Sequence, residues 1–162
     1  RRCQPIFKGI PMQTRSGDLI ALAKAGEFDV IVHGCNCQCA MDAGIAKQIK
    51  AEFPAAYAAD CAMPKSAEKL GQISTAQIDC NGHALTVVNA YTQTHWCGSG
   101  VLADYEAIRL AMRRIKTQFS GRRIAYPKIG AGLARGDWAR IARIIDEELA
   151  GETHTLVLYQ PC

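Results

Sequence analysis

A histidine, three cysteines and an asparagine precede a glycine-led turn in the stretch VIVHGCNCQCAMDAGIAKQI, residues 30–49. Side chains of these types can hold a metal, supply a reactive thiol, or line a cradle for a phosphorylated ligand. Cys35, Cys37 and Cys39 alternate, and this C-x-C spacing differs from the C-x₂₋₄-C pairs typical of zinc sites. A catalytic thiol also needs a neighbouring base and a lowered pKa. We therefore interpret the cysteines as small loop residues and predict neither a metal nor a cofactor, with a thiol or metal sensor as the alternative.

His33 lies at the end of the expected strand 29–34, and Asn36 follows it. An imidazole in that place can act as a general acid or base near neutral pH, although it can also simply bond a neighbouring loop. The chain then turns at Gly44 into an expected helix over 43–52. Glycine lets backbone N–H groups approach an anion closely, and a helix N-terminus adds a partial positive charge. This junction is therefore a candidate anion site.

A second junction of the same kind occurs in YPKIGAGLARGDW, residues 126–138, where the expected strand 123–129 leads into Gly130 and then a helix. Its spacing, G-x-G-x-x-x-G, does not match the dinucleotide-binding fingerprint, and the chain has no P-loop motif. A tight turn alone could explain either set of glycines. Two such junctions on one sheet edge predict a ligand with a diphosphate or two separated phosphates.

The elements that position these junctions alternate along the chain. Branched and apolar stretches predict strands at 10–16, 29–34, 72–79, 84–91, 123–129 and 154–160. Apolar residues spaced by three or four predict helices over 102–119 and 138–149, the second capped by Asp137. The pattern favours a three-layer α/β/α sandwich around a central mixed, mostly parallel sheet, whose ligands settle at the carboxyl ends of the strands.

Composition limits the class of protein. The 162 residues are 49% hydrophobic and predict a single domain, with residues 1–8 as a loose N-terminal segment. No apolar run approaches the length of a membrane span, and we expect a cytoplasmic monomer whose eight cysteines are free thiols. The formal charge of +4 is scattered, so we expect an anionic small molecule as the partner and neither a membrane nor a nucleic-acid surface.

Several of these motifs, in this order and spacing, resemble the macrodomain family over nearly the whole chain. They are SGDLI (16–20), VIVHGCNC (30–37), AGIAKQIKAEFP (43–54), YPKIGAGLARGDW (126–138) and LVLY (156–159). The two glycine-containing motifs are most similar to the branch with ADP-ribose 1″-phosphate phosphatases, common in bacteria, their phages and yeast. The resemblance implies that the chain binds ADP-ribose or ADP-ribose 1″-phosphate and hydrolyses the terminal phosphate monoester of the latter.

The resemblance also implies roles for individual residues. Asp18 accepts from the adenine amino group, Leu19 adds a backbone contact, and Tyr159 packs near adenine. Asn36 orients the distal ribose, and His33 matches a histidine implicated in the phosphatase branch, so both are assigned to catalysis. The diphosphate and distal ribose lie between two loops, Ala43, Gly44 and Ile45 on one side and Gly130, Ala131, Gly132, Leu133 and Ala134 on the other.

Three positions depart from the family pattern. Gln93 stands where the branch that removes ADP-ribose from glutamate or DNA has a lysine, and Ala134 stands where it has an aspartate. Asp42 replaces a glycine beside the diphosphate, and a carboxylate about 4 Å from a phosphate costs on the order of 4 kcal/mol if it points inward. Gln93 cannot form a Schiff base, so it argues against that branch's route. The alternatives to phosphatase activity are a non-catalytic ADP-ribose reader and an ADP-ribosyl hydrolase acting on modified protein or nucleic acid.

Overall fold

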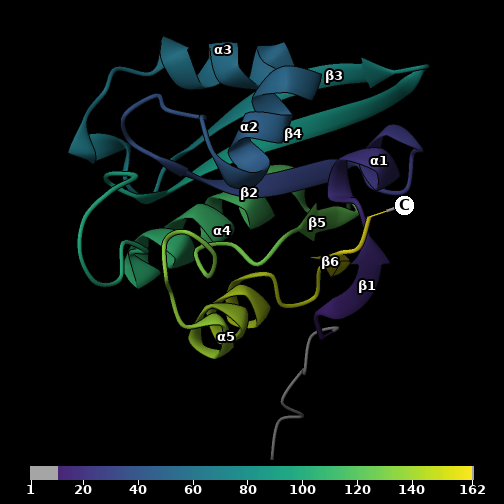
Figure 1. Cartoon of the computed structure of the whole chain (residues 1–162). Coiled ribbons are helices and arrows are strands. Elements are labelled where there is room, and N and C mark those ends of the chain that lie inside the picture. Colours follow the sequence, from purple (N-terminus) through teal and green to yellow (C-terminus); the bar gives the residue numbers. More distant parts are fainter. Residues whose placement is uncertain (1–10, 162) are drawn as a thin grey trace, which may run out of the picture.

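The computed structural model describes residues 11–161, so the expected loose segment 1–8 lies outside the described residues. Strands and helices alternate as the sequence predicts (Figure 1). The strands are β1 (Gln13–Gly17), β2 (Val30–Asn36), β3 (Ile73–Cys80), β4 (His83–Gln93), β5 (Ile124–Tyr126) and β6 (His154–Tyr159). The helices are α1 (Leu19–Lys24), α2 (Gly44–Glu52), α3 (Pro54–Ala62), the 3₁₀ helix η1 (Ala67–Lys69), α4 (Tyr105–Phe119) and α5 (Trp138–Glu148).

The six strands form one sheet in the order β1-β6-β5-β2-β4-β3. Every neighbouring pair is parallel except β3 and β4, which form an antiparallel hairpin. The carboxyl ends of β1, β6, β5, β2 and β4 therefore share one edge of the sheet. The predicted mixed, mostly parallel sheet is confirmed, and it brings both glycine-rich junctions to the same edge.

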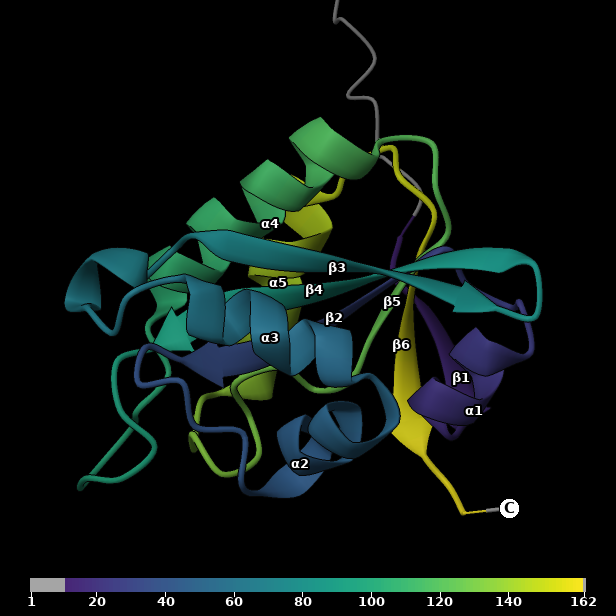
Figure 2. The ribbon, with the colours of Figure 1, turned by 90° about the horizontal axis from the view of Figure 1, so that it is seen from above.

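Helices cover both faces of the sheet, with α1, α2 and α3 on one side and α4 and α5 on the other (Figures 1 and 2). The apolar run in β2 explains how both layers are held. Val30 and Val32 pack into the core with α4 and α5, whereas Ile31 packs into the core with α1, α2 and α3. Because successive side chains of a strand point to opposite faces, a strand buried on both faces needs apolar residues throughout.

Aspartate side chains cap the N-termini of α4 and α5. Asp137 caps α5 by accepting a hydrogen bond from the Ala139 N–H, and Asp104 caps α4 in the same way through Ala107. Sequence analysis missed α1 and α3, because a six-residue helix and an alanine-rich helix show little apolar periodicity. No helix in residues 11–161 is both long and apolar enough to cross a membrane.

Candidate functional site

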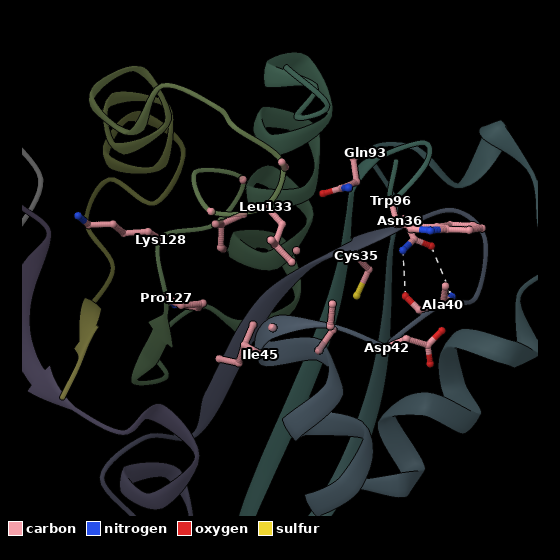
Figure 3. A pocket seen from close by; sticks show the side chains of 18 residues that line it. Cys35, Asn36, Ala40, Asp42, Ile45, Gln93, Trp96, Pro127, Lys128 and Leu133 are labelled. Atoms are coloured by element: carbon pink, nitrogen blue, oxygen red, sulfur yellow. Dashed lines mark hydrogen bonds between the residues drawn. The ribbon is translucent and has the colours of Figure 1, made fainter. Parts of the chain in front are cut away.

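A cavity of about 330 Å³ opens at the carboxyl edge of the sheet, between the ends of β2 and β5 (Figure 3). Its walls come from the β2–α2 loop with the start of α2, from the β5–α5 loop, and from the segment that follows β4. The lining residues are Gly34, Cys35, Asn36, Ala40, Asp42, Ala43, Gly44, Ile45, Ala46, Gln93, Trp96, Pro127, Lys128, Ile129, Gly130, Gly132, Leu133 and Ala134. Eight of the residues expected at the ligand are therefore brought together here.

The first wall is the N-terminus of α2. Its N-cap residue, Ala43, has an extended backbone and no side-chain capping hydrogen bond. The first N–H groups of a helix have no acceptor within the helix, and here no side chain replaces one. Gly44 allows the entry turn with a φ of +59°. The N–H groups of Gly44, Ile45 and Ala46 therefore form a positively polarised wall suited to an anion.

The second wall is the β5–α5 loop, which is folded tightly on itself. The Gly136 N–H donates to the Gly130 carbonyl at 2.7 Å, and the φ of Gly130 is +72°. A Cβ on Gly136 would lie 2.5 Å from that carbonyl oxygen, so the close approach requires glycine. Gly130, Gly132, Leu133 and Ala134 line the cavity as expected, whereas Ala131 belongs to the loop without lining it.

Asn36 lies at one end of the cavity with 8% of its surface exposed. Its Oδ1 accepts from the Gln38 N–H at 2.9 Å, and its Nδ2 donates to the Ala40 carbonyl at 2.9 Å. An asparagine amide has two N–H donors. Within the described part of the chain the second donor has no partner, so Asn36 shapes its own loop and keeps one hydrogen-bond donor for a ligand.

His33 is fully buried and does not line the cavity. Both N–H groups of Asn89 are occupied, by the Ala56 carbonyl and by Ser74 Oγ. The 2.6 Å contact between Asn89 Oδ1 and His33 Nε2 therefore requires His33 to donate from Nε2. Burial lowers the pKa of His33 to about 4, partly offset by the bond to Asn89 and the charge of Asp60. The expectation that His33 transfers a proton at the phosphate does not agree with this position, and we correct its role to a neutral structural one.

The cysteines differ in exposure but offer no thiolate at the cavity. Cys35 lines the cavity, and burial raises the pKa of its thiol well above the ordinary value. Across residues 11–161, no group of three His, Cys, Asp or Glu side chains is arranged to hold a metal ion. Cys35, Cys37, Cys39, Cys61, Cys80 and Cys97 are free thiols.

Asp42 lies at the rim, and its side chain is 78% exposed. Its carboxylate is 3.5 Å from the Lys50 ammonium and points away from the cavity (Figure 3). Water and the lysine therefore screen the carboxylate from a bound diphosphate. The strong penalty expected for an inward-pointing Asp42 does not apply to this arrangement.

Asp18, Leu19 and Tyr159 lie outside the cavity but on the same edge of the sheet. Gly17, just before Asp18, pairs with Tyr159 in the register of β1 and β6. Asp18 uses one carboxylate oxygen to cap α1, Leu19 is buried, and Tyr159 is 71% exposed. These three residues extend the edge beyond the cavity on the side of Pro127 and Lys128.

A buried polar cluster contacts the cysteine loop that follows β2, and sequence reasoning missed it. Lys69 and Asp60 are almost fully buried and form an ion pair of 2.9 Å. The Tyr91 hydroxyl donates to the same Asp60 oxygen at 2.7 Å, and Cys39 Sγ lies 3.7 Å from the Lys69 ammonium. Because these partners come from α3, η1, β4 and the cysteine loop, no spacing along the chain reveals them.

Sequence reasoning also missed Trp96 and Lys128 as lining residues. Lys128 lies at the opposite end of the cavity from Asn36, and Trp96 lies at the same end as Asn36 (Figure 3). For Trp96, the available signal in the sequence was a pair of glycines in the same loop, Gly98 and Gly100.

Comparison with known proteins adds family information to this geometry. A family model for the Macro domain matches residues 32–145. The chain is 32% identical over 137 residues to an uncharacterized 17.5 kDa protein in the tk-vs intergenic region of enterobacteria phage T4, covering 80% of this chain and 84% of that protein. It is 28% identical over 127 residues to the DNA ADP-ribosyl glycohydrolase of Mycobacterium tuberculosis, covering 76% of this chain but only 34% of that relative.

A solved structure supports the fold. Thermosipho africanus DarTG in complex with ADP-ribose matches with a TM-score of 0.71 and 16% identity, covering 91% of this chain and 42% of that chain. At this level of identity the likeness concerns the arrangement of helices and strands.

Proposed function

Because the chain belongs to the Macro domain family, we propose that it binds ADP-ribose along the carboxyl edge of its sheet and removes a substituent from C1″ of the distal ribose by hydrolysis. The observation that carries the proposal is the pair of backbone walls that face one cavity. One wall is the uncapped N-terminus of α2, and the other is the glycine loop after β5. Two anion-binding elements on opposite sides of a cavity suit a diphosphate.

The residues on either side of the cavity set the direction of the ligand. Adenine lies toward Asp18 and Tyr159, where the sheet edge is open and an exposed aromatic ring is available. The diphosphate lies between Gly44 and Gly130. The distal ribose then reaches Asn36, whose remaining N–H donates to a ribose hydroxyl.

Catalysis in this cavity depends on how the substrate and a water molecule are positioned, and on the dipoles of the backbone N–H groups that face them. His33 is too deeply buried to touch the substrate. Among the lining residues, the titratable side chains are Cys35, Asp42 and Lys128. Water is held against C1″ or its substituent by the walls of the cavity, and developing negative charge is stabilised by the N–H groups of the α2 wall.

Two substituents on C1″ have specific support. A phosphate monoester is the substrate implied by the resemblance of the two glycine motifs. ADP-ribosylated DNA is supported by the mycobacterial relative, which is named a DNA ADP-ribosyl glycohydrolase. A non-catalytic reader is the third candidate, favoured by the outward direction of Asp42 and the protonated Cys35 thiol.

One set of assays separates these candidates. ADP-ribose binding is measured by calorimetry, phosphate release from ADP-ribose 1″-phosphate by a colorimetric assay, and ADP-ribose release from an ADP-ribosylated DNA oligonucleotide by chromatography. We expect ADP-ribose binding and turnover of one of the two substrates. Binding without turnover of either would leave the reader, and absence of ADP-ribose binding would contradict the proposal.

The Asn36→Ala variant tests the assigned pose. It removes the ribose donor and the bonds that shape the loop, so we expect ADP-ribose affinity to fall about tenfold or more. Gln38→Ala is the matched control, because Gln38 belongs to the same loop but does not line the cavity. Equal affinities of the two variants would show that the distal ribose does not contact Asn36.

A further inference from the structure

An exposed tryptophan at the Asn36 end of the cavity has no role in the function derived so far. Trp96 is 60% exposed, and of the aromatic side chains in the described part of the chain it alone lines the cavity. Single exposed apolar side chains are common on protein surfaces, but this ring borders a cavity, where its flat apolar face is available to a ligand. In Figure 3 the indole lies at the end of the cavity that holds Asn36 and Ala40, opposite the end with Lys128 and Pro127.

The backbone that carries Trp96 is fixed at several points. The Thr94 carbonyl accepts from the Cys37 N–H at 3.1 Å and from the Gln38 side chain at 3.2 Å. On the other side of the tryptophan, Arg135 donates to the Gly98 carbonyl at 2.6 Å. The loop is therefore bonded to the segments on both sides of the cavity, and the backbone that carries the indole is held in place before a ligand arrives.

Charges at this end disfavour a second anion. Lys128 is the cationic side chain of the described lining, and it lies at the opposite end. Asp42 lies at the same end as Trp96 and is exposed to solvent. The face of an indole ring is also electronegative. Because Asp42 is paired with Lys50 and points away from the cavity, a terminal phosphate at this end would meet the negative ring face and no cationic side chain of the described lining.

A planar ring that is neutral or positively charged fits this environment. Stacking of a heteroaromatic base on a tryptophan is favourable and tolerant of base identity, and a ring cation gains further from the indole face. We propose that Trp96 is a stacking platform for a planar heteroaromatic group N-linked to C1″ of ADP-ribose. This inference rests on the proposed function, which places the distal ribose at Asn36.

Two sources supply this chemistry: a nucleobase that carries ADP-ribose, and the nicotinamide ring of NAD⁺. Calorimetric titrations with ADP-ribose, ADP-ribose 1″-phosphate, NAD⁺ and ADP-ribosylated thymidine distinguish them. The titrations use wild type, Trp96→Ala, Trp96→Phe and the control Val101→Ala, which removes an exposed apolar side chain of the same loop outside the cavity lining. Product analysis after each titration corrects for turnover.

We expect Trp96→Ala to weaken binding of at least one aromatic ligand about 5- to 150-fold, the equivalent of about 1–3 kcal/mol of stacking. Binding of ADP-ribose and its 1″-phosphate should change less than about twofold, because neither places a ring on the indole. Trp96→Phe should retain part of the affinity, and Val101→Ala should behave as wild type. A response to NAD⁺ alone assigns the nicotinamide, and a response to the thymidine adduct assigns the nucleobase.

Equal losses for aromatic ligands and ADP-ribose, or no loss for either aromatic ligand, would overturn the inference while leaving the proposed function intact. Failure of wild type to bind ADP-ribose would overturn both. Because Trp96 is exposed, the variants should keep the wild-type melting temperature, which confirms that a changed affinity reflects the ring and not the fold.

Discussion

His33 and Asn36 lie on the same strand, and their surroundings give them different roles. His33 sits under α3, bonded to Asn89 and fully buried, so its imidazole stays neutral and cannot exchange protons with a substrate. Asn36 lies where the strand meets the cavity, and one of its N–H groups has no partner among residues 11–161. At this scale, burial and hydrogen-bond occupancy decide which of the two polar side chains can meet a ligand.

The lowered pKa of His33 makes folding stability depend on pH. In the unfolded chain the imidazole protonates below a pKa of about 6.5, whereas in the folded chain it stays neutral down to a pKa of about 4. The unfolded state therefore binds more protons in this window, and stability that is complete above about pH 6.5 is lost as the pH falls toward about 4.

The His33→Gln variant tests this linkage, because glutamine keeps a neutral donor for Asn89 but does not titrate. Urea unfolding at about pH 7.5 and about pH 5 should show a larger loss of stability for wild type than for the variant. The same loss in both proteins would show that His33 is not the group that titrates.

The two walls of the cavity illustrate how elements build the site. The α2 wall depends on a helix that starts without a side-chain cap, at an alanine followed by a glycine with positive φ. The β5–α5 wall depends on two glycine backbones in contact, Gly136 and Gly130. In both walls small residues leave backbone N–H groups accessible, which a bulkier or polar side chain would prevent.

Substitution of Gly136 by alanine should disrupt the second wall. Its Cβ would meet the Gly130 carbonyl oxygen at 2.5 Å and Ile141 Cδ1 at 2.8 Å, so the loop must shift away from its bonded conformation. We expect a loss of about 1–3 kcal/mol in the free energy of unfolding, together with ADP-ribose affinity at least tenfold weaker.

Gly132→Ala is the control for this experiment, since a Cβ at Gly132 meets nothing within 4 Å. Its melting temperature should match that of wild type. If Gly136→Ala has the melting temperature of Gly132→Ala, the close contact of the two glycines does not hold the loop in its bonded conformation.

At the scale of the whole molecule, the layered fold and the position of the site could be predicted from the sequence, but several residues that decide the chemistry of the site could not. The apolar runs and the glycine junctions predicted the mixed sheet and its carboxyl edge because they depend on local pattern. The role of His33 depended on where its strand ends. The strand continues to Asn36, beyond the expected end at residue 34, so His33 lies inside the sheet. Trp96 and the Lys69–Asp60 pair depend on contacts between distant segments, which no spacing shows.

The central claim is that backbone N–H groups at the carboxyl edge of the sheet hold the diphosphate of ADP-ribose. A titration of ¹⁵N-labelled protein with ADP-ribose, followed by two-dimensional NMR, observes those groups directly. The amide resonances of Gly44, Ile45, Gly130 and Gly132 should shift and saturate together, whereas those of Gly82 and Gly151, at the opposite edge, should stay unchanged. Unmoved resonances at the two walls would contradict the account. A smaller hollow at the opposite edge of the sheet is lined by Arg15 and Arg123, and shifts confined to it would also contradict the account.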